Sequence, residues 1–322
     1  MKLKTAALAL GGLMASAITL AQPAWPSKPL TMVVGFAPGG ATDNVARIIA
    51  KSMADELGQN VVVENRAGAG GNIATDYVAR AEADGHTLLL GSVGSLTVAP
   101  HMNSKLPYQP LKDFAPVTMA VVFSNVLIVQ PTMKANSLAD YVKLAKAQPG
   151  KITYASPGIG GAGHLSGELL KMRADIDITH VVYKGGGPAM LAMLGGEIDS
   201  FIATPPSARQ HILNGKVRAL AVTGPKRDPL LPDVPTVAEQ GYPGFEVLNW
   251  YAYVVPAKTP KAVVDKLNQV LVKILKDPEV MVKLEKAGLS PSPSTPAELA
   301  AYMQREYDTW GTVIRKVGIK AD

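Results

Sequence analysis

The residues best suited to chemistry lie in two glycine-rich stretches, each between an apolar run typical of a strand and a predicted helix. The first stretch spans Phe36 to Asp43, and the second spans Ser156 to His164. Unpaired backbone N–H groups at the start of a helix point at one spot, and the peptide dipoles make that spot positive. The two stretches therefore predict an anion site made of backbone amides. The alternative is a purely structural turn, because glycine often joins a strand to a helix.

The second stretch also has the spacing of a dinucleotide-binding fingerprint. Gly158-x-Gly160-x-x-Gly163 follows a predicted strand and opens a predicted helix, as that fingerprint requires. The fingerprint also needs an acidic residue at the end of the next strand. Here Asp175 and Asp177 precede that strand instead. We therefore expect no nucleotide and no other cofactor.

A hydrolase is a further alternative, because Ser156, His164 and Asp199 could form a Ser/His/Asp set. No serine lies in a Gly-x-Ser-x-Gly elbow, which is the usual mark of an α/β-hydrolase. We therefore expect a binding protein rather than an enzyme. The histidines lack the paired spacing of metal ligands, so no metal is expected either; they are His86, His101, His164, His180 and His211.

Composition and the amino terminus indicate where the protein acts. The chain has 322 residues, enough for two domains, and no cysteine, which excludes disulfides and thiolate metal sites. Its net charge of +6 comes from dispersed Lys and Arg, so we expect no nucleic-acid partner. Lys2 and Lys4 precede an apolar run from Ala6 to Leu20, and a small-residue cleavage pattern ends at Ala21. We expect residues 1–21 to be a cleaved signal peptide and the mature protein to be periplasmic.

The glycine-rich stretches belong to a pattern of strand, glycine loop and helix that occurs twice. Residues 33–90 and residues 151–222 both follow it, which predicts two α/β lobes. Two long apolar segments, near 114–129 and 246–255, are expected to cross between them. We expect lobe 1 to comprise residues 25–124 and 248–322, and lobe 2 to comprise residues 125–247. One of Trp250 and Tyr251 is expected to line the cleft between the lobes.

Over its whole length the chain resembles the Bug family, the extracytoplasmic solute receptors of tripartite tricarboxylate transporters. The motifs that carry the resemblance are Trp25–Pro29, Gly35–Asp43, Val63–Asn72, Tyr154–His164, Tyr183–Gly185, Gly195–Asp199 and Leu231–Thr236. The resemblance implies an α/β, type II periplasmic-binding-protein (Venus-flytrap) fold, in which each lobe is a mostly parallel sheet flanked by helices. It also implies capture of a small carboxylate, such as a di- or tricarboxylate, and its delivery to the membrane subunits of a transporter. The alternatives are an exported sensor with the same ligand and a periplasmic hydrolase, and we expect a monomer.

The resemblance further implies which residues bind the ligand. Backbone amides of the two glycine-rich stretches grip one carboxylate, and neighbouring strand ends complete the pocket. Asp43 could contact the ligand or cap its helix, and capping is favoured. Pro157 departs from the family pattern and removes one N–H donor. The expected ligand-binding residues are Phe36, Ala37, Pro38, Gly39, Gly40, Thr42, Asp43, Ser92, Ser95, Ser156, Gly158, Gly160, Gly161, His164, Tyr183, Lys184, Asp199 and Thr204.

Overall fold

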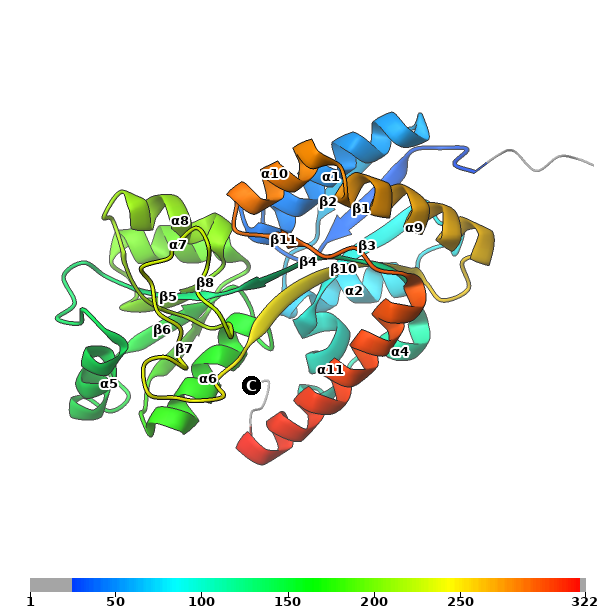
Figure 1. Cartoon of the computed structure of the whole chain (residues 1–322). Helices are drawn as coiled ribbons and strands as arrows, with labels where there is room; N and C mark the ends of the chain where they lie inside the picture. Colours follow the sequence, from blue (N-terminus) through cyan, green and yellow to red (C-terminus); the bar gives the residue numbers. More distant parts are fainter. Residues whose placement is uncertain (1–24, 319–322) are drawn as a thin grey trace, which may run out of the picture.

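Two β-sheets organise residues 25–318, the part of the chain that the computed structural model describes (Figure 1). The first sheet has six strands and the second has five. We call the part built on the first sheet lobe 1 and the part built on the second sheet lobe 2. The expected signal peptide, residues 1–21, lies outside the described residues. No helix in the described range is both long and apolar enough to cross a lipid bilayer.

Lobe 1 has helices on both faces of its sheet. Its strands are β1 Leu30–Val34, β2 Val61–Asn65, β3 Thr87–Ser92, β4 Phe114–Ser124, β10 Leu248–Pro256 and β11 Ser290–Pro291, in the order β11-β4-β10-β3-β1-β2. Its helices are α1 Ala41–Leu57, α2 Asn72–Ala79, α3 Ala99–Met102, α4 Pro110–Asp113, α9 Lys261–Leu275, α10 Pro278–Lys286 and α11 Pro296–Val317, with short helical turns at Ala69–Gly71 and Gly94–Val98. Figure 1 shows α1, α9 and α10 above the sheet and α2, α4 and α11 below it.

The side chains of β1 alternate between these two helical layers, as the pleat of a strand requires. Leu30, Met32 and Val34 share a buried cluster with residues of α1 and α9, whereas Val33 belongs to the cluster that contains residues of α2 and α11. Because helices cover both faces, the central strands read as nearly continuous apolar runs.

Lobe 2 repeats this arrangement with shorter elements. Its strands are β5 Val126–Val129, β6 Thr153–Ser156, β7 Thr179–Val182, β8 Ser200–Ala203 and β9 Arg218–Val222, in the order β7-β6-β8-β5-β9. Its helices are α5 Leu138–Ala147, α6 Ala162–Ala174, α7 Gly186–Gly195 and α8 Pro205–Leu213. Phe201 in β8 packs in the cluster of α7 and α8, and the next residue, Ile202, packs in the cluster of α5 and α6.

Both sheets are mixed, but most strands of each sheet run in one direction, as the family resemblance implies. β1 runs parallel to β2 and β3, and β6 runs parallel to β7 and β8. However, β10 runs antiparallel to β3 and β4, and β5 runs antiparallel to β8 and β9. β10 and β5 enter their sheets from the other lobe, and the short edge strand β11 also runs antiparallel to β4. The parallel strands still bring the glycine-rich loops to one edge of each sheet.

The two crossings between the lobes are hydrogen-bonded through one residue at the end of β9. β4 ends at Ser124 in the first sheet, and β5 begins at Val126 in the second. Between them, the Asn125 N–H donates to Thr223 Oγ1 at 3.0 Å. The Thr223 hydroxyl donates to the carbonyl oxygen of Val247, just before β10, at 2.8 Å. Three chain segments therefore meet at one place, and we call this crossing region the hinge.

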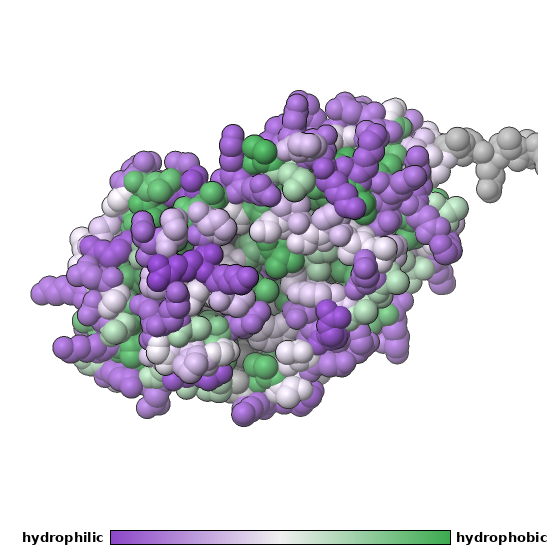
Figure 2. Space-filling model, in the orientation of Figure 1, coloured by the Kyte–Doolittle hydropathy of each residue, from purple (hydrophilic) through white to green (hydrophobic). Residues whose placement is uncertain are grey.

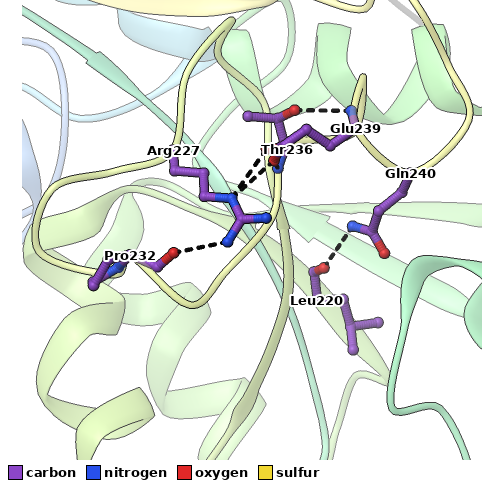
Figure 3. Close-up of polar contacts among 6 residues, drawn as sticks. All are labelled: Leu220, Arg227, Pro232, Thr236, Glu239 and Gln240. Carbon is purple, nitrogen blue, oxygen red and sulfur yellow. Dashed lines mark hydrogen bonds and ion pairs between the residues drawn. The ribbon is translucent and has the colours of Figure 1, made fainter.

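The proline-rich loop before β10 is held by a network of side chains (Figure 3). Arg227 Nε donates to both carboxylate oxygens of Glu239, at 3.1 and 3.0 Å, and its Nη1 donates to the Pro232 carbonyl at 3.0 Å. Gln240 Nε2 donates to the carbonyl oxygen of Leu220 in β9 at 2.9 Å. These bonds fix the loop to lobe 2 although its prolines lack N–H donors.

Candidate functional site

A small cavity lies where the two lobes meet, at the glycine-rich ends of the strands. Its volume is about 30 Å³, which is room for roughly two water molecules. Figure 2 shows that hydrophilic residues cover most of one face of the molecule, while paler and green residues gather between the lobes. The cavity is lined by Phe36, Gly40, Ala41, Thr42, Ser92, Val93, Pro157, Gly158, Gly161, Ala162, Gly163, Gly186, Thr204, Asn249 and Tyr251.

Size alone does not distinguish this cavity, because larger hollows lie elsewhere on the molecule. A groove of about 600 Å³ borders Lys28 and Thr87, at the opposite end of β1 and β3 from the glycine loops. Another, of about 690 Å³, borders Ser124 and Leu248 beside the hinge. The small cavity differs from both in the backbone that surrounds it.

Four helices begin at the small cavity. α1 begins at Ala41, α6 begins at Ala162, α7 begins at Gly186, and Thr204 is the N-cap of α8. All of these residues line the cavity, and none of its described lining residues is Asp, Glu, Lys or Arg. The first N–H groups of a helix have no partner inside the helix, and the helix dipole adds positive potential there. At α8 only the dipole contributes, because that helix begins with Pro205 and Pro206 and the Ser207 N–H donates to the Thr204 carbonyl. The cavity is therefore suited to an anion that accepts several N–H hydrogen bonds.

Asp43 supports the loop of lobe 1 from beneath. Its side chain is only 4% exposed, and its carboxylate accepts from the Gly39 N–H at 3.1 Å, from Arg47 Nε at 3.0 Å and from Asn65 Nδ2 at 3.0 Å. Asn65 Nδ2 also donates to the Phe36 carbonyl at 3.0 Å, so both ends of the loop are tied to one cluster. Burial by itself raises the pKa of Asp43, but the hydrogen bonds outweigh it and hold that pKa below its ordinary value.

This arrangement corrects the expected role of Asp43. The N-cap of α1 is Gly40, and no side chain caps that helix. Asp43 lies in the first helical turn and binds an amide that precedes the helix. It does not line the cavity, whereas its neighbour Thr42 does and is hydrogen-bonded to the Tyr251 hydroxyl. Asp43 is thus a positioning residue for the loop.

Two histidines support the corresponding loop of lobe 2. Ser156 is fully buried, and its Oγ lies 2.7 Å from Nε2 of His180, on the adjacent strand. His164 Nδ1 accepts from the Gly160 N–H at 3.1 Å. The two imidazole rings stack with centroids 4.3 Å apart. Ser156 and His164 therefore hold the loop and are not among the residues that line the cavity.

The Ser/His/Asp set is not assembled in this fold. The partner of Ser156 is His180, and Asp199 lies at the opposite end of β8 from Thr204. Asp199 precedes Thr204, at the cavity edge, by five positions of extended chain, which span roughly 16 Å. The Asp199 carboxylate accepts from the Thr153 N–H and hydroxyl, both at 2.8 Å. The described residues also contain no group of His, Cys, Asp or Glu side chains that could hold a metal ion.

The buried His180 leads to a prediction about pH. Burial, with smaller contributions from the neighbouring His164 and Lys171, lowers the pKa of His180 from 6.5 to about 3. A histidine with a depressed folded pKa stabilises the fold fully above its unfolded pKa and loses that contribution as pH falls toward the folded pKa. We expect the free energy of unfolding to fall by up to about 1.4 kcal/mol per pH unit from about pH 6 to 4.5.

Urea unfolding of the wild type and of His180→Gln over that pH range checks this prediction. Glutamine can still bond Ser156 but does not titrate, so the variant should show the flatter profile. Equal slopes for the two proteins would contradict the assignment.

The loops of the two lobes meet backbone to backbone along a line that we call the glycine seam. The Ala37 N–H of lobe 1 donates to the Lys184 carbonyl of lobe 2 at 2.8 Å. A Cβ atom built on Gly70 would lie 2.3 Å from the Ile159 carbonyl oxygen, and one built on Gly187 would lie 2.9 Å from the Pro38 carbonyl oxygen. Real side chains do not fit at such distances, so the lobes approach this closely only because glycine lies at these positions.

The expected ligand-binding residues thus fall into groups. Those that line the cavity are Phe36, Gly40, Thr42, Ser92, Gly158, Gly161 and Thr204. Those that lie at the glycine seam are Ala37, Pro38, Gly160 and Lys184. Those that support loops are Gly39, Asp43, Ser156 and His164. The structure does not bring the remaining three to the cavity: Ser95 accepts from the Tyr108 hydroxyl, Tyr183 is half-buried beside Ser156, and Asp199 binds Thr153.

Several lining residues are missing from the sequence-based set. Ala41, Pro157, Ala162 and Gly163 lie within the two glycine-rich stretches but were not singled out there as ligand-binding. Val93 follows Ser92, and Gly186 directly follows the motif Tyr183–Gly185. The sequence indicated Asn249 less directly, through its spacing from Tyr251. Asn249 precedes Tyr251 by two positions on one strand, so both side chains point to the same face. Of the two aromatic residues considered for the wall, Tyr251 lines the cavity and Trp250 packs in the core.

Comparison with known proteins gives a family match over most of the chain. Residues 45–319 match the family described as the tripartite tricarboxylate transporter family receptor. Protein BugT of Bordetella pertussis is 37% identical over 98% of both chains. A Pseudomonas sp. protein, named as the UPF0065 protein in a tcbD-tcbE intergenic region, is 42% identical over 93% of this chain and 89% of its own length.

Solved structures show the same architecture. The periplasmic binding protein BugD is 38% identical, with a TM-score of 0.89 over 92% of this chain and 100% of that one. An R. palustris protein with adipate is 35% identical, with a TM-score of 0.89 over 92% of this chain and 99% of that one. MatC from Rhodopseudomonas palustris with bound malate is 35% identical, with a TM-score of 0.86 over 90% and 100% of the two chains.

Proposed function

The chain belongs to the family of tripartite tricarboxylate transporter receptors, and from this membership we propose that it captures a small carboxylate between its two lobes. The observation that carries the proposal is the start of four helices at one cavity without charged side chains. A carboxylate there accepts N–H bonds from both lobes at once, and such charge-assisted bonds are short and strong. The bound adipate and malate of the two R. palustris proteins support this class of ligand.

Capture requires the lobes to separate and close again. The cavity of about 30 Å³ is too small for a dicarboxylate, so the ligand enters when the lobes are apart. The crossings at Asn125 and Val247 form the hinge, with lobe limits at residues 25–124 and 248–322 for lobe 1 and 125–247 for lobe 2. The ligand stabilises the closed form because only that form offers contacts to both lobes.

After capture, the protein releases its ligand to a partner in the membrane. We assign the mature protein to the periplasm after removal of residues 1–21, as a monomer that delivers its ligand to the membrane subunits of a tripartite transporter. The alternative role is that of an exported sensor for the same ligand. Loss of carboxylate uptake in a deletion strain supports transport, and unchanged uptake with altered gene induction supports sensing.

Calorimetric titration and thermal melting of the mature chain test ligand capture directly. The probes are malate, succinate, adipate and citrate, with a neutral sugar and an ammonium salt as controls. A ligand at 100 times its dissociation constant should add about 2.7 kcal/mol to the free energy of unfolding. Recovery of the acid unchanged separates binding from hydrolysis. If the sugar or the cation raises the melting temperature and no acid does, carboxylate capture is wrong.

A further inference from the structure

The floor of the cavity contains two buried polar atoms without a hydrogen-bond partner among the described residues. These atoms are Ser92 Oγ and Asn249 Oδ1, and their residues are 4% and 7% exposed. Ser92 is paired with Tyr251 across β3 and β10, and Asn249 lies two positions from Tyr251. All three side chains therefore share one face of the sheet and line the cavity. Buried polar atoms in folded proteins are normally paired, so these two need a partner that the chain does not supply.

The hinge determines how the Asn249 amide is presented. Asn249 Nδ2 lies 3.4 Å from Asn125 Oδ1, and the Asn125 backbone is bonded to Thr223. The amide nitrogen is therefore directed at the crossing between the lobes, and Oδ1 is the amide atom left without a partner among the described residues. An amide oxygen can only accept a hydrogen bond, whereas the Ser92 hydroxyl can donate or accept.

The amide oxygen of Asn249 does not complement a carboxylate oxygen, because both atoms can only accept a hydrogen bond. It complements a hydroxyl or amino group next to the carboxylate. None of the described lining residues is Asp or Glu, so a buried ammonium group would have no counter-charge. A hydroxyl has no such need. Resting on the proposed function, we propose that the cavity selects hydroxy-substituted carboxylates, with Asn249 Oδ1 accepting from the ligand hydroxyl and Ser92 Oγ beside it.

The test compares three acids with the same carbon skeleton. Malate carries a hydroxyl, aspartate carries an amino group, and succinate carries neither. A site built to bond a polar group discriminates strongly against an analogue that lacks it, because its own polar atoms are then left unpaired. Titration calorimetry of the wild-type protein should give malate an affinity about 100-fold or more above that of succinate. Malate should also bind more tightly than aspartate.

Variants at position 249 connect this preference to the amide. Asn249→Ala should reduce the malate-to-succinate ratio to below about 5-fold, mainly by weakening malate. Asn249→Asp adds the missing counter-charge and should move the preference toward aspartate. Asn214→Ala, an exposed asparagine at the end of α8, serves as the control and should keep the wild-type ratio. Melting of each ligand-free variant confirms that it is folded.

The outcomes separate the inference from the proposed function. If the wild type binds succinate as tightly as malate, or prefers aspartate, the hydroxyl assignment is wrong while carboxylate capture stands. A wild-type malate preference that persists in a folded Asn249→Ala variant also overturns the role of Asn249. If none of the three acids nor any other carboxylate binds, carboxylate capture itself fails.

Discussion

Gly70→Ala is expected to weaken ligand binding about 100-fold, although Gly70 is not among the residues that line the cavity. A Cβ atom at this position of lobe 1 would lie 2.3 Å from the Ile159 carbonyl oxygen of lobe 2. Backbone oxygens cannot move aside as a flexible side chain can, so the lobes must stay apart. The clash exists only in the closed form, and the affinity falls with the fraction of protein able to close.

Gly215→Ala provides a matched control for this experiment. Gly70 and Gly215 have nearly the same φ, +66° and +67°, but no atom lies within 4 Å of a Cβ built on Gly215. Both substitutions strain the backbone equally, by about 1 kcal/mol, so their ligand-free melting temperatures should fall together. Calorimetry should then show weak binding for Gly70→Ala alone, and small-angle scattering should show it open with ligand present. Equal affinities for the two variants would exclude the glycine seam from closure.

Asp43→Ala is expected to lower the free energy of unfolding by about 2 kcal/mol, because hydrogen bonds to a buried charged group are worth more than neutral ones. The substitution leaves the Gly39 N–H and Arg47 without their acceptor and releases the loop that lines the cavity. Ligand affinity should fall by at least about 10-fold, since the loop amides are no longer held in place before binding. Urea unfolding and calorimetry measure the two effects.

Arg47→Ala is the control for the charge of this cluster. The Arg47 side chain is 55% exposed, so its ion pair with Asp43 should contribute no more than about 1 kcal/mol. The pH dependence adds a second check. Because the folded pKa of Asp43 lies below its ordinary value of 3.8, its stabilising effect is present above that pH and is lost as pH falls through the folded pKa. The wild type and Asp43→Ala should therefore converge in stability in strong acid, and a constant difference would contradict the role of the carboxylate.

Features that depend on neighbouring residues can be predicted from the sequence. Ser137 and Asp140 form a capping box at the start of α5, and Gly58 ends α1 in the left-handed conformation with φ of 64°. The helix starts at both glycine-rich loops follow in the same way from a strand, a glycine turn and an apolar helical pattern. The cavity between the lobes therefore lies at the strand ends where the sequence predicts an anion site.

Contacts between residues far apart in the chain could not be predicted in this way. The His180 ring supports Ser156 because of the register of two adjacent strands, and Asp199 is kept from the cavity by the direction of β8. The mixed direction of the sheets likewise depends on how the crossing segments enter them. Neither strand register nor strand order is encoded in local hydrogen bonding or periodicity.

The sequence by itself determined two α/β lobes and two glycine-rich loops, because hydrophobic periodicity and turn chemistry act over a few residues. Only the tertiary structure decided which groups line the cavity. Asn249 reaches the cavity because its strand crosses between the lobes, and Gly70 meets Ile159 because the two lobes are in contact. Both contacts depend on the placement of one lobe against the other, which is an interaction of whole surfaces rather than of sequence neighbours.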